Sequence, residues 1–377
     1  MKRVAVLGST GSVGVSALDV AAHLGLEVGG LAARSRREAL RGQIERFRPA
    51  RAALADAGEC ELLRAELNGG ATRLHAGPEG VRTVAGAAES DLVLCAISGA
   101  ACLGPVLEAA ARGKTLALAN KESMVMAGPL LLEAARKSGA AIVPVDSEHS
   151  AIFQALRGGG PGEVRRVFLT ASGGPFSKLP KEDFAAITPE RALKHPTWTM
   201  GGKITVDSAT MFNKALEIVE AKWLFGLEPS QIEVLVHPQS IIHSMVEFVD
   251  GSVLAQLGLP DMRTPIQVAF TWPERAPGNV KRLNLAEVRT LTFEEPDREK
   301  FPSIGLGYRA AEAGGTMGAV LNAANEVAVE RFMAGEIPFP RIFGLVREVM
   351  DRHAVVPRPS LEDVLRADAW ARQEARC

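Results

Sequence analysis

A glycine-rich turn near the start of the chain constrains the fold more than any other feature. The segment Gly8-Ser-Thr-Gly11-Ser-Val-Gly14 follows an apolar strand-like segment at residues 4–7 and precedes an amphipathic stretch. Glycines at these positions allow a tight turn and the close approach of a pyrophosphate to free amide groups at a helix N-terminus. The pattern predicts a dinucleotide-binding βαβ unit, although its spacing is GxxGxxG rather than GxGxxG, and a plain structural turn is the alternative.

Apolar segments and helical segments then alternate through the first 145 residues. The apolar segments lie at residues 26–33, 91–98, 114–120 and 140–145, and amphipathic stretches rich in alanine and arginine separate them. Such alternation predicts right-handed crossovers and a mainly parallel sheet with helices on both faces. We therefore expect an α/β fold with an N-terminal doubly wound, Rossmann-like domain at residues 1–145.

Three further parts are predicted after this domain. Residues 146–271 hold strand-like segments, among them a hairpin at 244–257 whose Asp250-Gly251 pair suits a type I′ turn, and they predict a mixed α/β domain. Recurring prolines predict an extended linker at residues 272–300. Residues 301–377 predict a C-terminal helical bundle, with Pro340 in the first turn of one helix and Ser360 capping another.

Charge and cysteine usage exclude several classes of partner. The 43 Lys and Arg balance 44 Asp and Glu, and no run of five or six like charges is present, which argues against nucleic-acid binding. The longest uncharged run, at residues 92–107, is too short for a membrane helix, and the N-terminus does not resemble a signal peptide. The four cysteines lack CxxC spacing, so a disulfide scaffold and a Cys-zinc site are not expected. We expect a cytoplasmic protein.

The end of the second strand-like segment indicates which dinucleotide is bound. An NAD enzyme places an acidic residue there, whereas this chain has Ala33-Arg-Ser-Arg-Arg37. NADP is therefore favoured over NAD, with Arg34 and Ser35 as the main candidates for its 2′-phosphate. Arg36 and Arg37 fit equally well as the solvated first turn of the following helix.

Acidic residues after the first domain indicate a metal site. Asp146 and Glu148 follow a strand-like segment, and positions i and i+2 of an extended segment point to the same side. Two facing carboxylates repel each other unless a cation or a proton lies between them, and oxygen ligands alone select Mg²⁺ or Mn²⁺. The alternative is a pair of solvated or helix-capping acids.

A second polar cluster lies in the segment 207–217. Asn213, Lys214 and Glu217 fall on one face of a predicted helix, so a phosphate could bind to Ser208, Asn213 and Lys214 while Glu217 serves as a third metal ligand. A plain surface Lys-Glu pair is the alternative. Ser172, in a glycine-rich turn, offers a hydroxyl to a phosphate or a sugar oxygen.

Residues 195–202 combine a histidine, a tryptophan and paired glycines, which suits a lid that closes over a ligand and excludes water. His237 and His243 lie in the segment 237–243, and for each a structural role is the more common one.

Nine ordered strings together resemble one known family. They are GSTGSVG, LANKES, PVDSEHSAIFQ, TASGGPF, HPTWTMG, TVDSATMFNKALEIVEA, HPQSIIHSMV, LGLPDMRTPI and LNAANE. The chain is similar in these strings, from residue 3 to the C-terminal helices, to the 1-deoxy-D-xylulose 5-phosphate reductoisomerases. The resemblance implies NADPH- and metal-dependent isomerisation and reduction of 1-deoxy-D-xylulose 5-phosphate to 2-C-methyl-D-erythritol 4-phosphate, a step of non-mevalonate isoprenoid biosynthesis. It also implies Mg²⁺ or Mn²⁺, with Co²⁺ as a further candidate, and a homodimer whose middle domains pair.

The resemblance also implies roles for individual residues. The implied metal ligands are Asp146, Glu148 and Glu217. The implied substrate contacts are Ser147, Ser172, His195, Trp198, Ser208, Asn213 and Lys214. The implied cofactor contacts are Gly8, Thr10, Gly11, Ser12, Val13, Asn120, Lys121, Glu122, Met200 and Gly201, in addition to Arg34 and Ser35. Glu148 or Lys121 is expected nearest the proton transfers, and His195 completes the catalytic set.

The chain departs from the family pattern at one point, and two alternative functions are considered. Relatives carry a Gly-Lys-Asn-like turn after the second strand, whereas this chain has Ala33-Arg34-Ser35, which leaves the binding of the adenosine phosphate open. An NADP-dependent semialdehyde dehydrogenase would need a nucleophilic cysteine in its second domain, and no cysteine lies between Cys102 and Cys377. A non-catalytic NADP-sensing module is the other alternative, and an assay of metal-dependent NADPH oxidation would separate it from an enzyme.

Overall fold

The computed structural model describes residues 2–67, 69–194 and 201–377. The chain forms two compact units, and neither is continuous in sequence. Unit 1 comprises Met1–Ser123, Leu131–Ser150 and Asp261–Lys281, and unit 2 comprises Met124–Leu130, Ala151–Pro260 and Arg282–Cys377. The finer division into four parts stays a prediction.

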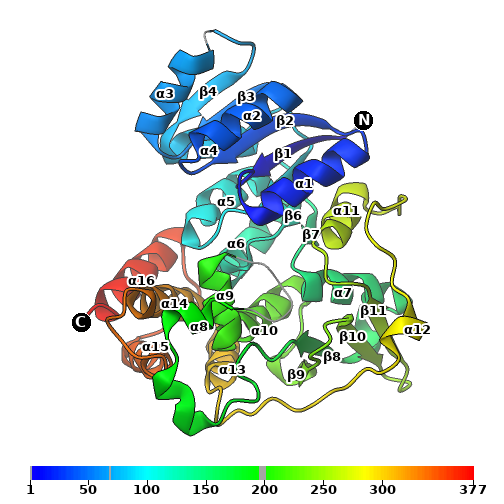
Figure 1. Ribbon diagram of the computed structural model, residues 1–377, viewed down its shortest axis with the longest axis vertical. Coiled ribbons are helices and arrows are strands. Elements are labelled where there is room, and N and C mark those ends of the chain that lie inside the picture. Colours follow the sequence, from blue (N-terminus) through cyan, green and yellow to red (C-terminus); the bar gives the residue numbers. More distant parts are fainter. Residues whose placement is uncertain (1, 68, 195–200) are drawn as a thin grey trace. The chain divides into compact units, whose positions relative to one another are not determined.

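A seven-stranded parallel sheet forms the centre of unit 1 (Figure 1). Its order is β4-β3-β2-β1-β5-β6-β7, and every neighbouring pair is parallel. The strands are β1 Arg3–Leu7, β2 Glu27–Ala33, β3 Arg51–Leu54, β4 Arg73–Ala76, β5 Leu92–Cys95, β6 Thr115–Leu118 and β7 Ile142–Pro144. The helices that begin in this unit are α1 Ser12–His23, α2 Arg37–Phe47, α3 Ala57–Leu67, α4 Gly77–Gly86, α5 Leu103–Ala111, α6 Lys121–Ser138, α7 Ser147–Ala155 and α11 Arg263–Thr271, with the short 3₁₀ helix η1 at Ala100–Cys102. The predicted doubly wound domain is confirmed.

The strand order reverses between β1 and β5. The chain runs outward from β1 to β4 on one side and then returns to continue from β5 to β7 on the other side. In open α/β sheets, ligands bind outside the carboxyl ends of the strands at such a switch point. The turn that follows β1 lies at this position.

Unit 2 is built on a four-stranded mixed sheet with the order β11-β10-β8-β9. Its strands are β8 Val164–Ala171, β9 Ile232–Val236, β10 Ile242–Phe248 and β11 Val253–Leu257. The expected hairpin joins β10 and β11, but the predicted type I′ turn is wrong. Gly251 has a positive φ of +87° and Asp250 does not, while the amide of Gly251 donates to the carbonyl of Phe248 at 3.0 Å. The strands are therefore joined, over residues 249–252, by a turn that a left-handed glycine closes, as in a G1 bulge.

The other regular elements that begin in unit 2 are helices. They are α8 Pro189–Ala192, α9 Gly202–Ala209, α10 Phe212–Phe225, α12 Leu285–Val288, α13 Ser303–Ala313, α14 Met317–Met333, α15 Arg341–Arg352 and α16 Leu361–Glu374, with 3₁₀ helices at Leu156–Gly158, Pro161–Glu163, Lys181–Ala186 and Pro229–Gln231. The capping box of Ser360 and Asp363 is present, whereas Pro340 lies at the N-cap, one residue before the predicted position. The C-terminal region is helical, as expected.

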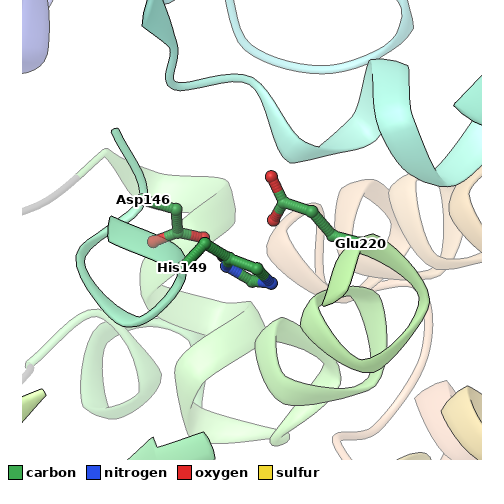
Figure 2. Close-up of side chains that lie close together, drawn as sticks. All are labelled: Asp146, His149 and Glu220. Carbon is green, nitrogen blue, oxygen red and sulfur yellow. Dashed lines mark ion pairs between the residues drawn. The ribbon is translucent and has the colours of Figure 1, made fainter. Parts of the chain in front are cut away.

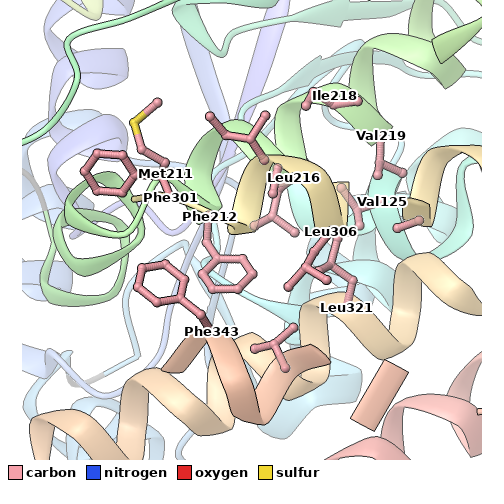
Figure 3. Packing of buried hydrophobic residues seen from close by; sticks show 14 of the residues in the cluster. Val125, Met211, Phe212, Leu216, Ile218, Val219, Phe301, Leu306, Leu321 and Phe343 are labelled. Carbon is pink, nitrogen blue, oxygen red and sulfur yellow. The ribbon is translucent and has the colours of Figure 1, made fainter. Parts of the chain in front are cut away.

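The apolar core of unit 2 packs these helices around α10 (Figure 3). Phe212 and Leu216 of α10 are buried with Leu306 of α13 and Leu321 of α14, and the rings of Phe212 and Phe343 stack with centroids 6.0 Å apart. Burial of side chains of this size contributes roughly 1.5–3 kcal/mol each. Helix α10, which carries several polar candidates, is thus held by apolar contacts along its length.

Among the residues that the structure describes, no helix is both long enough and apolar enough to cross a membrane.

Candidate functional site

The turn after β1 has the geometry of a phosphate-binding turn. Gly8 has a φ of +84°, and a Cβ there would lie 2.5 Å from the carbonyl oxygen of Ala96, the residue that follows β5. A Cβ on Gly14 would collide with the carbonyl of Gly8. Gly11 is the N-cap of α1, and it has no side chain to occupy the amide groups of the first turn. The N-terminus of α1 can therefore receive an anion at the switch point.

The residues after β2 differ in their surroundings. Arg34 and Ser35 are exposed to solvent. Arg37 forms ion pairs with Glu59 and Glu66 of α3, at 3.3 and 3.0 Å, which agrees with the helix-surface alternative for this residue. Arg36 instead donates from Nη1 to the carbonyl of Thr10 at 3.1 Å, so its guanidinium lies against the glycine-rich turn.

The segment after β6 is fixed by a buried amide. Asn120 is the N-cap of α6, and its Oδ1 accepts from the amide of Ser123 at 2.9 Å. Its Nδ2 donates to the carbonyls of Ile97 and Gly99 and to the Glu122 carboxylate, at 2.9, 3.1 and 2.9 Å. The Asn120 side chain therefore joins the segments that follow β5 and β6, and this fixes the N-terminus of α6.

Lys121 and the acids after β7 lie together in unit 1. The Lys121 ammonium, which is almost fully buried, forms an ion pair with Asp146. Ser147 donates to Glu148 at 2.5 Å. The predicted reason for the convergence of Asp146 and Glu148 is wrong, because Ser147 and Glu148 form the first turn of helix α7 rather than an extended segment.

Two groups of acidic and histidine side chains could hold a metal ion. Asp146, Glu148 and Glu217 each offer an oxygen, and these three ligand atoms lie within 4.8 Å of one another. Asp146, His149 and Glu220 form a second such group, in which His149 and Glu220 are fully buried (Figure 2). Both groups share Asp146, which precedes α7, and draw on α10. Helix α7 itself continues from unit 1 into unit 2.

Sequence reasoning did not single out His149 or Glu220. His149 lies three residues after Asp146, with Nδ1 3.8 Å from an Asp146 oxygen, and Glu220 lies three residues after Glu217 on α10. The signal that could have found them is the i, i+3 spacing on two helices.

Glu217 is a buried carboxylate that is held on α10 by cationic and amide groups. It accepts from Asn213 and forms an ion pair with Lys214. Lys214 is also buried, and its ammonium donates to the carbonyl of Thr170, at the end of β8, at 2.5 Å. An isolated buried charge is costly, and this arrangement gives the buried carboxylate an ammonium and an amide as partners.

The serines predicted to contact phosphate lie on two neighbouring backbone segments of unit 2. Ser172 follows β8 and accepts from the amide of Gly174 at 3.3 Å. A Cβ on Gly174 would lie 2.5 Å from the carbonyl of Ser208, so the glycine turn packs directly against the end of α9. Met211, with a φ of +59°, forms the corner between α9 and α10. Ser208, near the end of α9, therefore lies close to the start of α10. Such left-handed conformations of non-glycine residues cluster at functional sites.

Several candidate residues are not part of the groups described above. His195, Trp198 and Met200 fall outside the described residues, while Gly201 is the exposed N-cap of α9. His237 is fully buried, its ring accepts from the amides of Ile241 and Ile242, and Nδ1 lies 2.8 Å from the carbonyl of Thr292. These bonds occupy both ring nitrogens, so His237 has a structural role.

Comparison with known proteins identifies the family. A model described as 1-deoxy-D-xylulose 5-phosphate reductoisomerase matches residues 4–128, its C-terminal domain matches residues 142–225, and a DXP reductoisomerase C-terminal domain matches residues 257–374. A relative of that name from Symbiobacterium thermophilum is 55% identical over 381 residues, covering 100% of this chain and 98% of the relative. One from Pelotomaculum thermopropionicum is 52% identical, covering 99% and 97%.

Solved structures agree in fold over the whole chain. The reductoisomerase from Zymomonas mobilis in complex with NADPH has a TM-score of 0.93 and 42% identity, covering 99% of this chain and 98% of its own. A reductoisomerase in complex with NADPH, fosmidomycin and magnesium has a TM-score of 0.94 and 37% identity, covering 100% and 98%. Neither a semialdehyde dehydrogenase nor a non-catalytic sensor is favoured by these matches. The chain belongs to the 1-deoxy-D-xylulose 5-phosphate reductoisomerase family.

Proposed function

We propose that the chain rearranges 1-deoxy-D-xylulose 5-phosphate and reduces the product with NADPH to 2-C-methyl-D-erythritol 4-phosphate, at a divalent ion held by Asp146, Glu148 and Glu217. The observation that carries this proposal is the grouping of one oxygen from each of the three carboxylates within 4.8 Å. Three like charges at this separation repel strongly unless a cation is present. Oxygen donors alone fit Mg²⁺ or Mn²⁺, and Co²⁺ remains a further candidate.

Two lysines lie beside this acidic group. Lys121 pairs with Asp146, and Lys214 pairs with Glu217, so an ammonium borders each of these two carboxylates. When bound, the divalent ion would polarise the substrate oxygens and stabilise negative charge that develops on them. Glu148 or Lys121 would move the proton of a substrate hydroxyl; Lys121 pairs with Asp146, and Glu148 lies two residues after Asp146.

The phosphate of the substrate would bind to unit 2. Ser172 and Ser208 offer hydroxyls from packed backbone segments, and Asn213 and Lys214 offer an amide and an ammonium from the start of α10. The shared use of Lys214 by Glu217 and by a phosphate would join substrate binding to the metal site. The roles of His195, Trp198 and Gly201 in a lid remain part of the proposal.

NADPH would bind at the switch point of unit 1. The proposed pyrophosphate contacts lie in the turn from Gly8 to Val13, where a side chain at Gly8 has no room, and Asn120, Lys121 and Glu122 would border the nicotinamide. Arg34 and Ser35 are exposed and available for the 2′-phosphate, with Arg36 beside the turn. The cofactor supplies the hydride for the reduction.

Glu217→Gln tests the metal site. We expect the variant to fold, to bind Mn²⁺ at least tenfold more weakly by electron paramagnetic resonance, and to lose most of its turnover. Glu233→Gln is the matched control, because Glu233 pairs with Arg166 on the sheet of unit 2 and takes no part in the acidic group. Unchanged Mn²⁺ binding by Glu217→Gln would contradict the assignment.

A homodimer belongs to the same proposal. Strand β11 is an edge of the four-stranded sheet, and it exposes Val253, Leu254 and Leu257 at 47, 41 and 36%. Exposed apolar edge strands pair readily with another chain, so a second copy of this chain is the expected partner at β11. A cytoplasmic location is also part of the proposal, since the reaction consumes NADPH.

A further inference from the structure

We propose that Asp207 on α9 and Asn325 on α14 are positioning residues for the substrate phosphate. They form a buried polar link that holds helix α9, and with it Ser208, in place. This inference rests on the proposed phosphate contact of Ser208, and it adds residues that do not touch the substrate themselves.

The link consists of three side chains within unit 2. The Asn325 amide donates to Oδ1 of Asp207 at 2.7 Å, although the two residues are 118 positions apart. The other oxygen of Asp207 lies 2.9 Å from the Lys203 ammonium, one turn earlier on α9. Asp207 is 2% exposed and Asn325 is fully buried, so water does not compete for the bond between these two side chains.

The link acts at the end of α9 that carries Ser208. Asp207 directly precedes Ser208, and the corner that follows is held by a second contact, in which Ser303 of α13 donates to the carbonyl of Thr210 at 2.6 Å. Both contacts come from helices of the C-terminal region, and both fix backbone on either side of Ser208. The glycine turn that follows β8 packs at Gly174 against the carbonyl group of Ser208 itself. Ser208 therefore has neighbours that leave its backbone little freedom.

The choice of residue types supports a positioning role. A buried carboxylate contributes little net stability compared with apolar side chains of the same volume, because removing the charge from water is costly. A carboxylate with one amide donor and one ammonium partner does, however, fix the orientation of α9 relative to α14. Catalysis requires a binding group to be placed to within a fraction of an ångström, whereas folding does not require such precision.

Asn322 provides a matched control on the same helix. It lies one turn before Asn325, is equally buried, and donates to Glu326 of α14 itself at 3.1 Å. Asn322→Ala therefore removes a buried amide from α14 without removing a contact to Asp207. Loss of stability alone should be similar in Asn322→Ala and Asn325→Ala.

The test uses the full-length protein with Mg²⁺ and NADPH and measures inorganic phosphate as an inhibitor competitive with the substrate. Asn325→Ala should raise the inhibition constant of phosphate and the KM of the substrate by about tenfold, with the dissociation constant of NADPH unchanged. Asn322→Ala should leave all three constants within about twofold. The reversed pair D207N/N325D, which restores an amide-to-carboxylate bond, should recover more of the phosphate affinity than D207N or N325D alone.

The outcomes separate this inference from the proposed function. If phosphate competes with the substrate in the unmodified enzyme but Asn325→Ala and Asn322→Ala behave alike, the positioning role is overturned while the phosphate site stands. If the reversed pair is no better than the single variants, the Asp207–Asn325 bond is not what positions Ser208. If phosphate does not compete in the unmodified enzyme, the phosphate site itself is wrong, and the positioning role fails with it.

Discussion

Replacing Lys214 with methionine should tighten the binding of a divalent ion and at the same time weaken the use of the substrate. In the structure the Lys214 ammonium forms an ion pair with the buried Glu217 carboxylate and donates to the Thr170 carbonyl. A divalent ion on Glu217 must share the carboxylate with this ammonium. Methionine has a similar length and no charge, so the competition disappears while the volume is kept.

The magnitude follows from the charges involved. An ammonium and a divalent ion about 4 Å apart repel by roughly 8 kcal/mol at an effective dielectric constant of 20, twice the value for two unit charges. Rearrangement of the neighbouring dipoles and screening oppose most of this change, so we expect a net gain of about 1.4–2.8 kcal/mol, or roughly ten- to a hundredfold tighter binding. Without the ion, loss of one partner of a buried pair should destabilise the variant by about 3–5 kcal/mol.

The assay is a titration of the metal-free protein with Mn²⁺, followed by electron paramagnetic resonance, together with kcat/KM for the substrate. Lys222→Met is the matched control, since Lys222 lies on the same helix and its ammonium donates to the Ala311 carbonyl. We expect tighter Mn²⁺ binding only in Lys214→Met, with a fall in kcat/KM of tenfold or more at saturating metal. Weaker or unchanged Mn²⁺ binding would refute the reasoning from the ion pair.

Three further predictions concern other parts of the chain. Arg34→Ala should raise the KM for NADPH about ten- to a hundredfold, as expected for loss of a charge-assisted contact of roughly 1.5–3 kcal/mol, and it should leave the KM for NADH nearly unchanged. Arg37→Ala is the control: it breaks ion pairs to α3 and should change the two KM values to the same extent. Val253→Lys on the exposed edge strand should give a monomer in analytical ultracentrifugation, while the similarly exposed Val356→Lys should not. Burial lowers the pKa of His353 below 6.5, so its contribution to stability is complete above pH 6.5 and declines as the pH falls toward the folded-state value. His353→Gln should therefore flatten the loss of thermal stability as the pH falls below 6.5, and an unchanged slope would show that His353 does not cause this loss.

The strands that pattern alone could not predict are the short ones. Five strands of the parallel sheet follow from apolar segments bounded by turns, but β3 and β4 do not. Each has only four residues, Arg-Ala-Ala-Leu and Arg-Leu-His-Ala, without a β-branched side chain. Their strand conformation comes from pairing with β2 and with each other, which is information that lies outside the segments themselves.

The sequence predicted which residues belong to the candidate site better than it predicted their geometry. The three carboxylates were expected to converge, yet Glu148 reaches the group from a helical turn and not from an extended one. Ser208 and Asn213 were expected near one phosphate, but a left-handed Met211 separates them onto two helices. A helix start and a corner depend on packing from distant segments, such as Ser303 on Thr210, so local sequence could not fix them. The roles of these residues in binding stay predictions.

The interleaved course of the chain also bears on how the protein is made. Unit 1 is not complete at Ser150, because it also includes Asp261–Lys281, and helix α11 within that segment packs against α1. A ribosome that adds about 5–20 residues per second needs on the order of ten seconds to travel from the one point to the other. During that interval the surface of α1 that α11 later covers is open on the nascent chain. The unit that holds the parallel sheet, although it is begun first, therefore cannot finish folding until more than half of the other unit has been synthesised.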